Sequence, residues 1–472
     1  MRNWPMSSPT SNSRARARAK TTRSSCCARA SPRVELFREL GGPANSKTAS
    51  LNNYVVFARA LRTAALAGLA LLASPGPAFG NGRFPAAGQI AADPGDPAHL
   101  VVRATYGMLR GQGEDWRWIC ETSVGYEDNE DPFFAVLQGG SLIAATFRGL
   151  SVSPDGGCSW TRVPGDAGAL PALDLVRDAQ NPARAVALTT VQLDDDERQR
   201  LMATDDSGKS WQPLGIALPQ GFFGSTLEMA PGLPTRLYVV GAQGVTVSLA
   251  RSDDAGKSWQ VAPIALNGGQ AAYLSAVDPL NPDRLWLRVQ HEDGDRLLVS
   301  GNGGTSWQQV FQASGALLGF ALSPDGSQVA LAVPKAGVWR AMTADHLFAK
   351  VNPVGARCLT WTPAGLFACG DEATQGFTIA RSTDGGATFV PKLLQASLQP
   401  ATCPADTRTA KVCPNYWPAV AIQLGILKPT PVPPPAKPAP ADEGCGAARA
   451  AKASGVAGWV GLMLTAWWLR RR

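Results

Sequence analysis

Apolar residues along this chain fall into short runs that come in pairs joined by a polar turn. The clearest pairs are IAADPGDPAHLVVRA (90–104), LDLVRDAQNPARAVAL (173–188) and LSAVDPLNPDRLWLRV (274–289). Looser copies are LEMAPGLPTRLYVV (227–240) and FALSPDGSQVALAV (320–333). Runs of this length, bounded by Pro, Asn, Asp and Gly, are typical of β-strands joined by tight turns. The pattern predicts that each pair forms the first two strands of a repeated unit.

An eight-residue pattern, which we name the tip motif, recurs out of phase with these pairs. It reads SPDGGCSW (153–160), TDDSGKSW (204–211), SDDAGKSW (252–259), SGNGGTSW (300–307) and STDGGATF (382–389). Asp or Asn stands third, Gly fifth and an aromatic residue eighth, at Asp155, Gly157, Trp160, Asp206, Gly208, Trp211, Asp254, Gly256, Trp259, Asn302, Gly304, Trp307, Asp384, Gly386 and Phe389. The Asp carboxylate can accept nearby backbone N–H groups, Gly permits positive φ, and the ring is a buried anchor. The motif therefore predicts a fixed hairpin tip between the third and fourth strands of each unit.

The tip aromatics recur at a nearly constant interval. Trp160, Trp211, Trp259 and Trp307 are separated by 51, 48 and 48 residues, and Phe348 stands halfway between Trp307 and Phe389. A degenerate copy places Trp116 44 residues before Trp160. A period of 40–50 residues with four strands per unit is typical of a propeller. We therefore predict an all-β, seven-bladed β-propeller of four-stranded units over residues 81–427.

The tip motif resembles the Asp-box, or BNR, repeat. Proteins with this repeat include sialidases, sortilin-type receptors and photosystem II assembly-factor-like proteins. The resemblance implies a β-propeller, and it leaves the activity open because Asp-box propellers differ widely in function.

Calcium and zinc sites are not expected from the sequence. Asp205-Asp206 and Asp253-Asp254 resemble the start of a calcium loop, but the twelfth position, where such a loop needs Glu, holds Ile216 and Ile264. The chain has only three His and no CxxC pair, so we predict no metal site and no cofactor.

The net charge of +7 belongs to the ends of the chain. Residues 1–80 carry a net +10 and residues 445–472 a net +5, which leaves −8 for residues 81–444. The predicted propeller is thus mildly acidic and lacks the basic surface that nucleic-acid binding requires.

Six of the nine cysteines lie within the predicted propeller region, which suggests three disulfides and an oxidising compartment. Cys358 and Cys369 flank a Pro-Ala-Gly turn symmetrically, so we expect them to face each other across a hairpin. Keeping every bridge short in sequence then predicts pairs Cys403–Cys413 and Cys120–Cys158.

Two irregular segments are expected to be connections. LDDDERQR (193–200) is predicted to be a solvated loop between the second and third strands of the third unit. Residues 403–425 are predicted to form a disulfide-closed loop followed by one strand that covers an edge where the ring closes.

The ends of the chain predict export and anchoring. Residues 1–50 have the composition of a disordered segment, and the true translation start can lie downstream of them. Residues 51–80 have the parts of a signal peptide, so the mature protein is expected to begin at Asn81. Residues 428–444 are Pro-rich and predict a stiff linker.

The last segment, 445–472, joins Cys445 to a short apolar helix and three terminal arginines. It resembles the MYXO-CTERM sorting tail, with Cys445 as the processing residue. An ordinary C-terminal membrane helix is the alternative. Either reading holds the protein at the cell surface or outer membrane through its tail.

No catalytic motif stands out in the sequence. A sialidase needs three arginines, a Tyr nucleophile and an acid, and the nearest match to its Arg motif is Gly82-Arg83-Phe84-Pro85, in the wrong order. We therefore predict a surface-displayed module that binds or assembles an unidentified protein or glycan ligand. The alternative is an extracellular glycoside hydrolase or lyase with two carboxylates in the central funnel.

Overall fold

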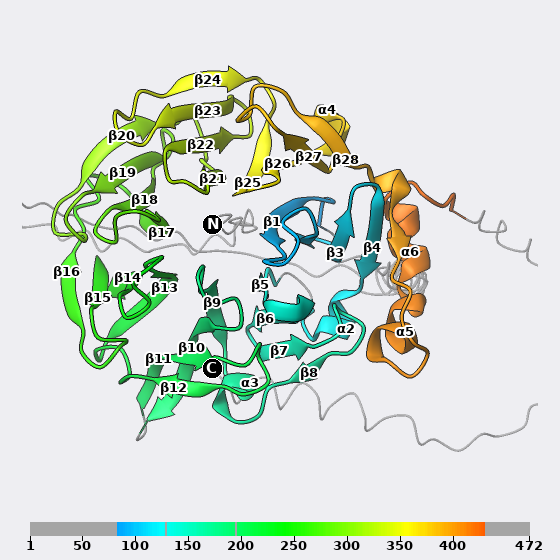
Figure 1. Ribbon diagram of the computed structural model, residues 1–472, viewed down its shortest axis with the longest axis horizontal. Coiled ribbons are helices and arrows are strands. Elements are labelled where there is room, and N and C mark those ends of the chain that lie inside the picture. The colour runs from blue at the N-terminus through cyan, green and yellow to red at the C-terminus, as the bar shows by residue number, and fades with distance from the viewer. Residues whose placement is uncertain (1–82, 128–129, 194–195, 430–472) are drawn as a thin grey trace, which may run out of the picture. The chain divides into compact units, whose positions relative to one another are not determined.

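Seven β-sheets, each antiparallel among its consecutive strands, stand around a common centre in the computed structural model, which describes residues 83–127, 130–193 and 196–429 (Figure 1). Six sheets have four strands, and the first has a fifth, added from the C-terminal part of the chain. The fold is the predicted seven-bladed β-propeller. The expected signal peptide, the processing residue Cys445 and the C-terminal helix lie outside the described residues.

The blades follow one another along the chain, each running from the centre outward. Their strands are β1 (Ala87–Ala92), β2 (Leu100–Ala104), β3 (Gly107–Gln112), β4 (Asp115–Ile119); β5 (Phe133–Val136), β6 (Leu142–Thr146), β7 (Gly149–Ser153), β8 (Thr161–Arg162); β9 (Ala172–Arg177), β10 (Ala185–Leu193), β11 (Asp196–Thr204), β12 (Gln212–Leu214); β13 (Phe222–Met229), β14 (Leu237–Gln243), β15 (Thr246–Ser252), β16 (Gln260–Pro263); β17 (Ala271–Val277), β18 (Leu285–Gln290), β19 (Arg296–Ser300), β20 (Gln308–Gln312); β21 (Gly319–Leu322), β22 (Gln328–Val333), β23 (Gly337–Met342), β24 (Ala349–Asn352); β25 (Ala356–Thr362), β26 (Gly365–Gly370), β27 (Ile379–Ser382), β28 (Val390–Leu393). Short helical turns are α2 (Glu121–Val124), η1 (Gln138–Gly140), α3 (Asp166–Ala169), α4 (Glu372–Gln375) and η2 (Gln395–Ser397).

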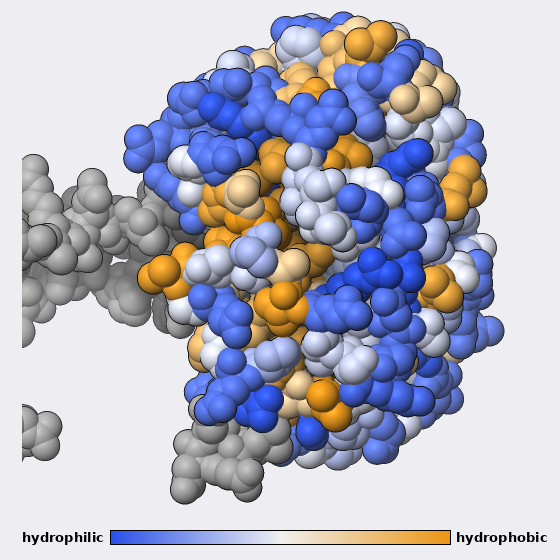
Figure 2. Space-filling view, turned by 90° about the vertical axis from the view of Figure 1, so that its left-hand side faces the viewer, coloured by the Kyte–Doolittle hydropathy of each residue, from blue (hydrophilic) through white to orange (hydrophobic). Residues whose placement is uncertain are grey.

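The core lies between the faces of neighbouring blades. Leu188 of blade three, for example, shares a buried cluster with Val239 of blade four, and Ala332 of blade six shares one with Leu359 of blade seven. Each blade is thus apolar on both faces, which explains the nearly continuous hydrophobic runs of its middle strands. The outer wall near β16 and β20 carries a band of apolar side chains between hydrophilic edges (Figure 2).

Polar side chains join the innermost strands. The Gln89 amide both donates to the Phe134 carbonyl (3.1 Å) and accepts from the Phe134 N–H (2.9 Å). The Leu274 N–H donates to the Thr226 hydroxyl at 3.0 Å. These buried side chains satisfy backbone groups of the next blade, so their role is structural.

The two degenerate units form hairpins equivalent to the others. Trp116 lies in β4, the fourth strand of blade one, and its Nε1 donates to the Gly113 carbonyl at 3.1 Å. Phe348 precedes β24 and packs on Phe311, with ring centroids 5.0 Å apart. The predicted blade count is therefore confirmed.

The ring closes by a strap, not by a strand shared between the first and last blades. After blade seven, β29 (Gln399–Pro400) pairs in parallel with β4, and α5 (Arg408–Val412), η3 (Cys413–Asn415) and α6 (Trp417–Gln423) follow. We name residues 399–428 the C-terminal strap. Figure 1 shows α5 and α6 beside β4 and α2.

Two sequence predictions are corrected here. The segment 403–425, expected to end in one strand, instead forms α5, η3 and α6, and the strand of the strap, β29, comes before it. The strap does cover the edge of blade one, as expected. The loop predicted at 193–200 is much shorter, since residues 196–200 pair with β10 within a nine-residue β11.

Among the described residues, no helix combines the length and apolar character needed to cross a membrane.

Candidate functional site

The tip motif forms the same hydrogen-bonded turn in every blade that carries it. In blade four, the Asp254 carboxylate accepts from the Ser258 N–H (2.9 Å) and from the hydroxyls of Ser258 (2.6 Å) and Ser252 (2.8 Å). The Ser252 hydroxyl accepts the Gly256 N–H at 2.8 Å. Asn302 makes the equivalent contacts in blade five without a charge. The first, third, fifth and seventh positions of the motif therefore close the turn by hydrogen bonds.

The tip motifs are spread around the ring, one to a blade, so they do not assemble a shared site. The hydrogen bonds from Ser258, and then that from Ser252, lower the pKa of Asp254 to about 2. The ring nitrogens of Trp160 and Trp211 donate to the Gly157 and Gly208 carbonyls at 3.0 and 3.2 Å. These residues form the scaffold of the hairpin tips, as predicted.

An arginine from the third strand of one blade touches the tip of the next blade at three places. Arg110 donates to the Gly156 carbonyl, and Arg340 donates to the carbonyls of Asp384 (3.0 Å) and Gly385 (3.2 Å). Arg251 also lies against the next tip, at Gly303, but its guanidinium pairs with Asp253 and not with a tip carbonyl. Each of these glycines has positive φ, and a Cβ there would lie closer than 3.0 Å to the arginine. The positive φ favours Gly at the fourth position of these motifs, and the arginine contact adds to that preference.

The disulfides hold the C-terminal strap to the start of the ring. The Cys358–Cys369 bridge is confirmed, and the two residues are directly opposed in the hairpin. The other predicted pairs are wrong: Cys120 bonds to Cys413, and Cys158 bonds to Cys403. Short loops were favoured in the prediction, but the strap returns to blades one and two after the whole ring has formed.

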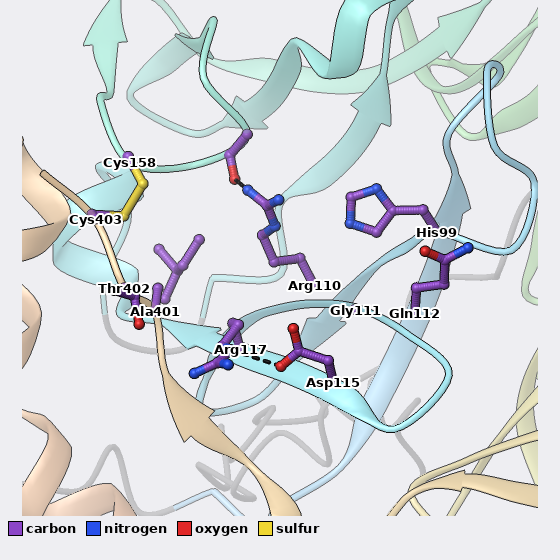
Figure 3. Close-up of a pocket in the computed structure, with 12 residues that line it drawn as sticks. His99, Arg110, Gly111, Gln112, Asp115, Arg117, Cys158, Ala401, Thr402 and Cys403 are labelled. Atoms are coloured by element: carbon purple, nitrogen blue, oxygen red, sulfur yellow. Dashed lines mark hydrogen bonds and ion pairs between the residues drawn. A yellow bond between two sulfur atoms is a disulfide. The ribbon is translucent and has the colours of Figure 1, made fainter.

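A polar cavity of about 420 Å³ lies where the strap meets blades one and two (Figure 3). This volume falls within the usual range for small-ligand sites. Blade one supplies most of its wall, the tip of blade two supplies Gly156 and Cys158, and the strap supplies Ala401, Thr402 and Cys403. The Cys158–Cys403 bridge forms one edge of the cavity, so two of its walls are covalently joined.

The charged side chains of this cavity differ in how they are compensated. Arg117 pairs with Asp115 (Nε–Oδ1 2.8 Å) and also donates to Gln399. Arg110 donates to the Gly156 carbonyl, and the His99 ring lies beside Arg110 (Figure 3). Burial, and after it the Arg110 charge, lower the pKa of His99, which favours the neutral imidazole at pH 7.

Several buried carboxylates elsewhere in the ring have structural partners. Asp174 is fully buried and accepts the Leu227 N–H of the next blade at 2.7 Å. Asp295 pairs with Arg288 at 2.6 Å inside blade five. The Phe147 N–H donates to Glu130. Within the described ranges, no group of three or more His, Cys, Asp and Glu side chains is placed to hold a metal ion.

Sequence reasoning identified the hairpin tips and missed the cavity. Arg110 and His99 stand in ordinary strand and turn contexts, and nothing in their neighbourhood signals a site. The cavity exists because the strap at residues 401–403 returns to blade one, a contact across roughly three hundred residues that no local pattern encodes. The paired cysteines were the available signal, but spacing alone does not give their connectivity.

Comparisons with known proteins give structural likeness only. No protein-family model and no curated protein sequence matches the chain. Solved structures similar to it include an ancestral GH74 enzyme (14% identity, TM-score 0.49, covering 66% of this chain and 46% of that one). Others are the GH74 xyloglucanase from Xanthomonas campestris (18%, 0.36, 67% and 63%) and YCF48 bound to D1 peptide (16%, 0.34, 49% and 69%). The match spans less than two thirds of the length of both GH74 structures. At these identities and scores the likeness carries no argument about function.

Proposed function

We propose that the protein is an exported β-propeller that binds a protein or glycan ligand without transforming it. The observation that carries this proposal is the cavity between the strap and blades one and two. Its walls are held by two long-range disulfides and by the strap's pairing with β4. A site whose walls are already fixed loses little entropy when a ligand binds. The three disulfides are consistent with an extracellular protein.

The proposal also includes the type of repeat and the cellular location of the protein. The hydrogen-bonded tips support their assignment as Asp-boxes, because the hydroxyl, Asp and Gly positions of the motif close the turn. The sequence supports export through residues 51–80 and attachment to the cell surface through residues 445–472, in the manner of a MYXO-CTERM tail.

A hydrolase in the central funnel is not proposed. Such an enzyme needs two carboxylates that point into the funnel and leave room for a sugar between them. Asp174 and Asp295, two of the buried carboxylates, hold a backbone N–H and an arginine.

The test is an array of glycans and extracellular proteins probed with the purified mature protein and with a variant whose cavity is filled. Thr402→Trp places a large ring in the mouth of the cavity, where Thr402 is exposed. Thr246→Trp, at an exposed strand position in blade four, is the matched control. The proposal expects ligands that bind wild type and Thr246→Trp, and bind Thr402→Trp at least about tenfold more weakly, a difference of about 1.4 kcal/mol. Ligands that bind all three proteins equally, or no ligand at all, would refute it.

A further inference from the structure

The guanidinium of Arg110 brings a positive charge into the lining of this cavity. The residue just before the tip turn is also arginine at Arg251, where Asp253 (3.0 Å) and Asp283 (3.5 Å) compensate it. Among the residues that the structure describes, no carboxylate lies within ion-pair distance of Arg110; its one hydrogen bond goes to the Gly156 carbonyl. A guanidinium offers five N–H donors in a planar fork, which suits a carboxylate. Arg110 therefore has donors and charge left for a ligand.

The lining of the cavity adds up to a single positive charge. Arg117 is neutralised by Asp115, and His99 is uncharged near pH 7 for the reasons given above. Arg110 supplies the remaining charge. The charge of Arg110 can neutralise a ligand with one negative charge. The remaining charges of a polyanion would be repelled by the net −8 of residues 81–444.

The remaining polar groups suit hydroxyls. Asp115 is a carboxylate that accepts hydrogen bonds, and Thr402 has a hydroxyl that both donates and accepts. Gln112 uses its amide nitrogen on Asp96 at 2.7 Å, which leaves its carbonyl oxygen as an acceptor. Such groups recognise a ligand that carries several hydroxyls beside its charge.

We infer that this cavity binds a singly charged, polyhydroxylated carboxylate, that is, a sugar acid, with its carboxylate on Arg110 and its hydroxyls on Asp115, Gln112 and Thr402. The inference rests on the proposed function and names the ligand class of that same site. It favours a glycan terminus over an acidic peptide, because the lining offers one uncompensated charge and several hydroxyl partners.

The experiment is a calorimetric titration of the purified mature protein with methyl glucuronide, and with methyl glucoside as its uncharged counterpart. Arg110→Ala removes the proposed anchor, and Arg340→Ala is the matched control. Arg340 occupies the equivalent position in blade six and bonds the next tip in the same way, but it does not line this cavity. Arg110→Lys keeps the positive charge and loses the planar set of N–H donors of the guanidinium. Thermal unfolding of each variant checks that it is folded.

The inference expects the glucuronide to bind about tenfold or more tightly than the glucoside, because a charge-assisted pair is lost with the carboxylate. Arg110→Ala should weaken glucuronide binding by at least about tenfold, Arg110→Lys by less, and Arg340→Ala not at all. Raising the salt concentration should weaken the binding of the glucuronide and leave that of the glucoside unchanged.

Three results would overturn the inference. One is no binding of the glucuronide, or equal binding of both sugars. Another is an equal loss in Arg340→Ala. The third is tighter, Arg110-dependent binding of an oligoglutamate peptide, which would assign the cavity to an acidic protein. The proposed binding function is tested separately on the array. If array ligands bind wild type and bind Thr402→Trp more weakly, the binding function stands even when the sugar-acid inference fails.

Discussion

At the scale of single residues, each tip is closed by hydrogen bonds between side chains and the backbone within eight residues. The hydroxyl at the first position, the carboxylate at the third and the Gly at the fifth each have the partner that their chemistry predicts. Arg110 and Arg340 are different. Their contacts reach the next blade, and their residue type alone does not reveal that.

The acid sensitivity of the fold should be traceable to the tip carboxylates. The folded-state pKa of Asp254 is about 2, below its ordinary value of 3.8, so folding favours the charged form. Its stabilising effect is complete above about pH 4 and is lost as the pH falls toward 2. Asp254→Asn should therefore flatten the fall in melting temperature over that window, because Asn302 shows that an amide can close the same turn. The reciprocal change, Asn302→Asp, should steepen it; two unchanged profiles would contradict the prediction.

The arginine and glycine that meet between blades should be energetically coupled. Gly385→Ala forces an alanine to φ near 71° and against Arg340, and should cost about 2 kcal/mol of unfolding free energy. Removing the guanidinium with Arg340→Ala should reduce that cost by about 0.5 kcal/mol or more. The tip of blade four shows the arrangement without an arginine. Its Ala255 adopts φ 60°, and the preceding blade has Ala203 where blade six has Arg340. A denaturant double-mutant cycle measures the coupling, and strict additivity would refute it.

At the scale of elements, local pattern was a good guide wherever partners are near in sequence. The paired apolar runs became the two inner strands of their blades, and the symmetric hairpin placed Cys358 opposite Cys369. The strap was predicted poorly. Its helical turns at α5 and α6 have no long amphipathic repeat, and its disulfide partners in blades one and two lie 293 and 245 residues away, respectively. A rule that prefers short bridges fails when a segment returns to the start of the chain.

The strap bridges should stabilise the fold more than the hairpin bridge does. In the chain-entropy account, a bridge stabilises by about 3 kcal/mol for a 15-residue loop and about 5 kcal/mol for a 100-residue loop. Replacing Cys120, Cys158, Cys403 and Cys413 by Ala should therefore cost more than replacing the hairpin pair, whose separation is 11. Amide exchange should rise in β4 and β29 specifically.

Non-reducing peptide mapping of the wild-type protein provides the control for that comparison. It should recover Cys403 linked to Cys158 and Cys413 linked to Cys120. A Cys403–Cys413 peptide, or exchange that rises equally in all seven blades, would contradict the assigned role of the strap.

At the scale of the whole molecule, the period of the tip aromatics was enough to count the blades, because each unit repeats one supersecondary structure. The same repeat pattern does not predict the position of the cavity. The cavity arises where the segment that follows blade seven returns to blades one and two. A site built from such a junction cannot be read from any single repeat.

Export and anchoring remain predictions from the sequence. The mature protein should begin at Asn81, and deletion of residues 445–472 should release a folded propeller into the medium, because the apolar tail is the predicted tether. N-terminal sequencing and fractionation after a high-salt wash measure the two outcomes. A peptide from residues 1–50, or a truncated protein that stays with membranes, would contradict them.

The strap also determines how the ring would carry mechanical force. Tension applied at Lys428 reaches Cys413 before it reaches blade seven, and Cys413 is covalently bonded to Cys120 at the end of β4. The load therefore passes into the first blade through a covalent bond, and β28 is not peeled from the edge of the last blade. The Cys158–Cys403 bond shares that load with blade two. A propeller held by its C-terminal end against flowing liquid would keep its ring closed for as long as those two bonds remain oxidised.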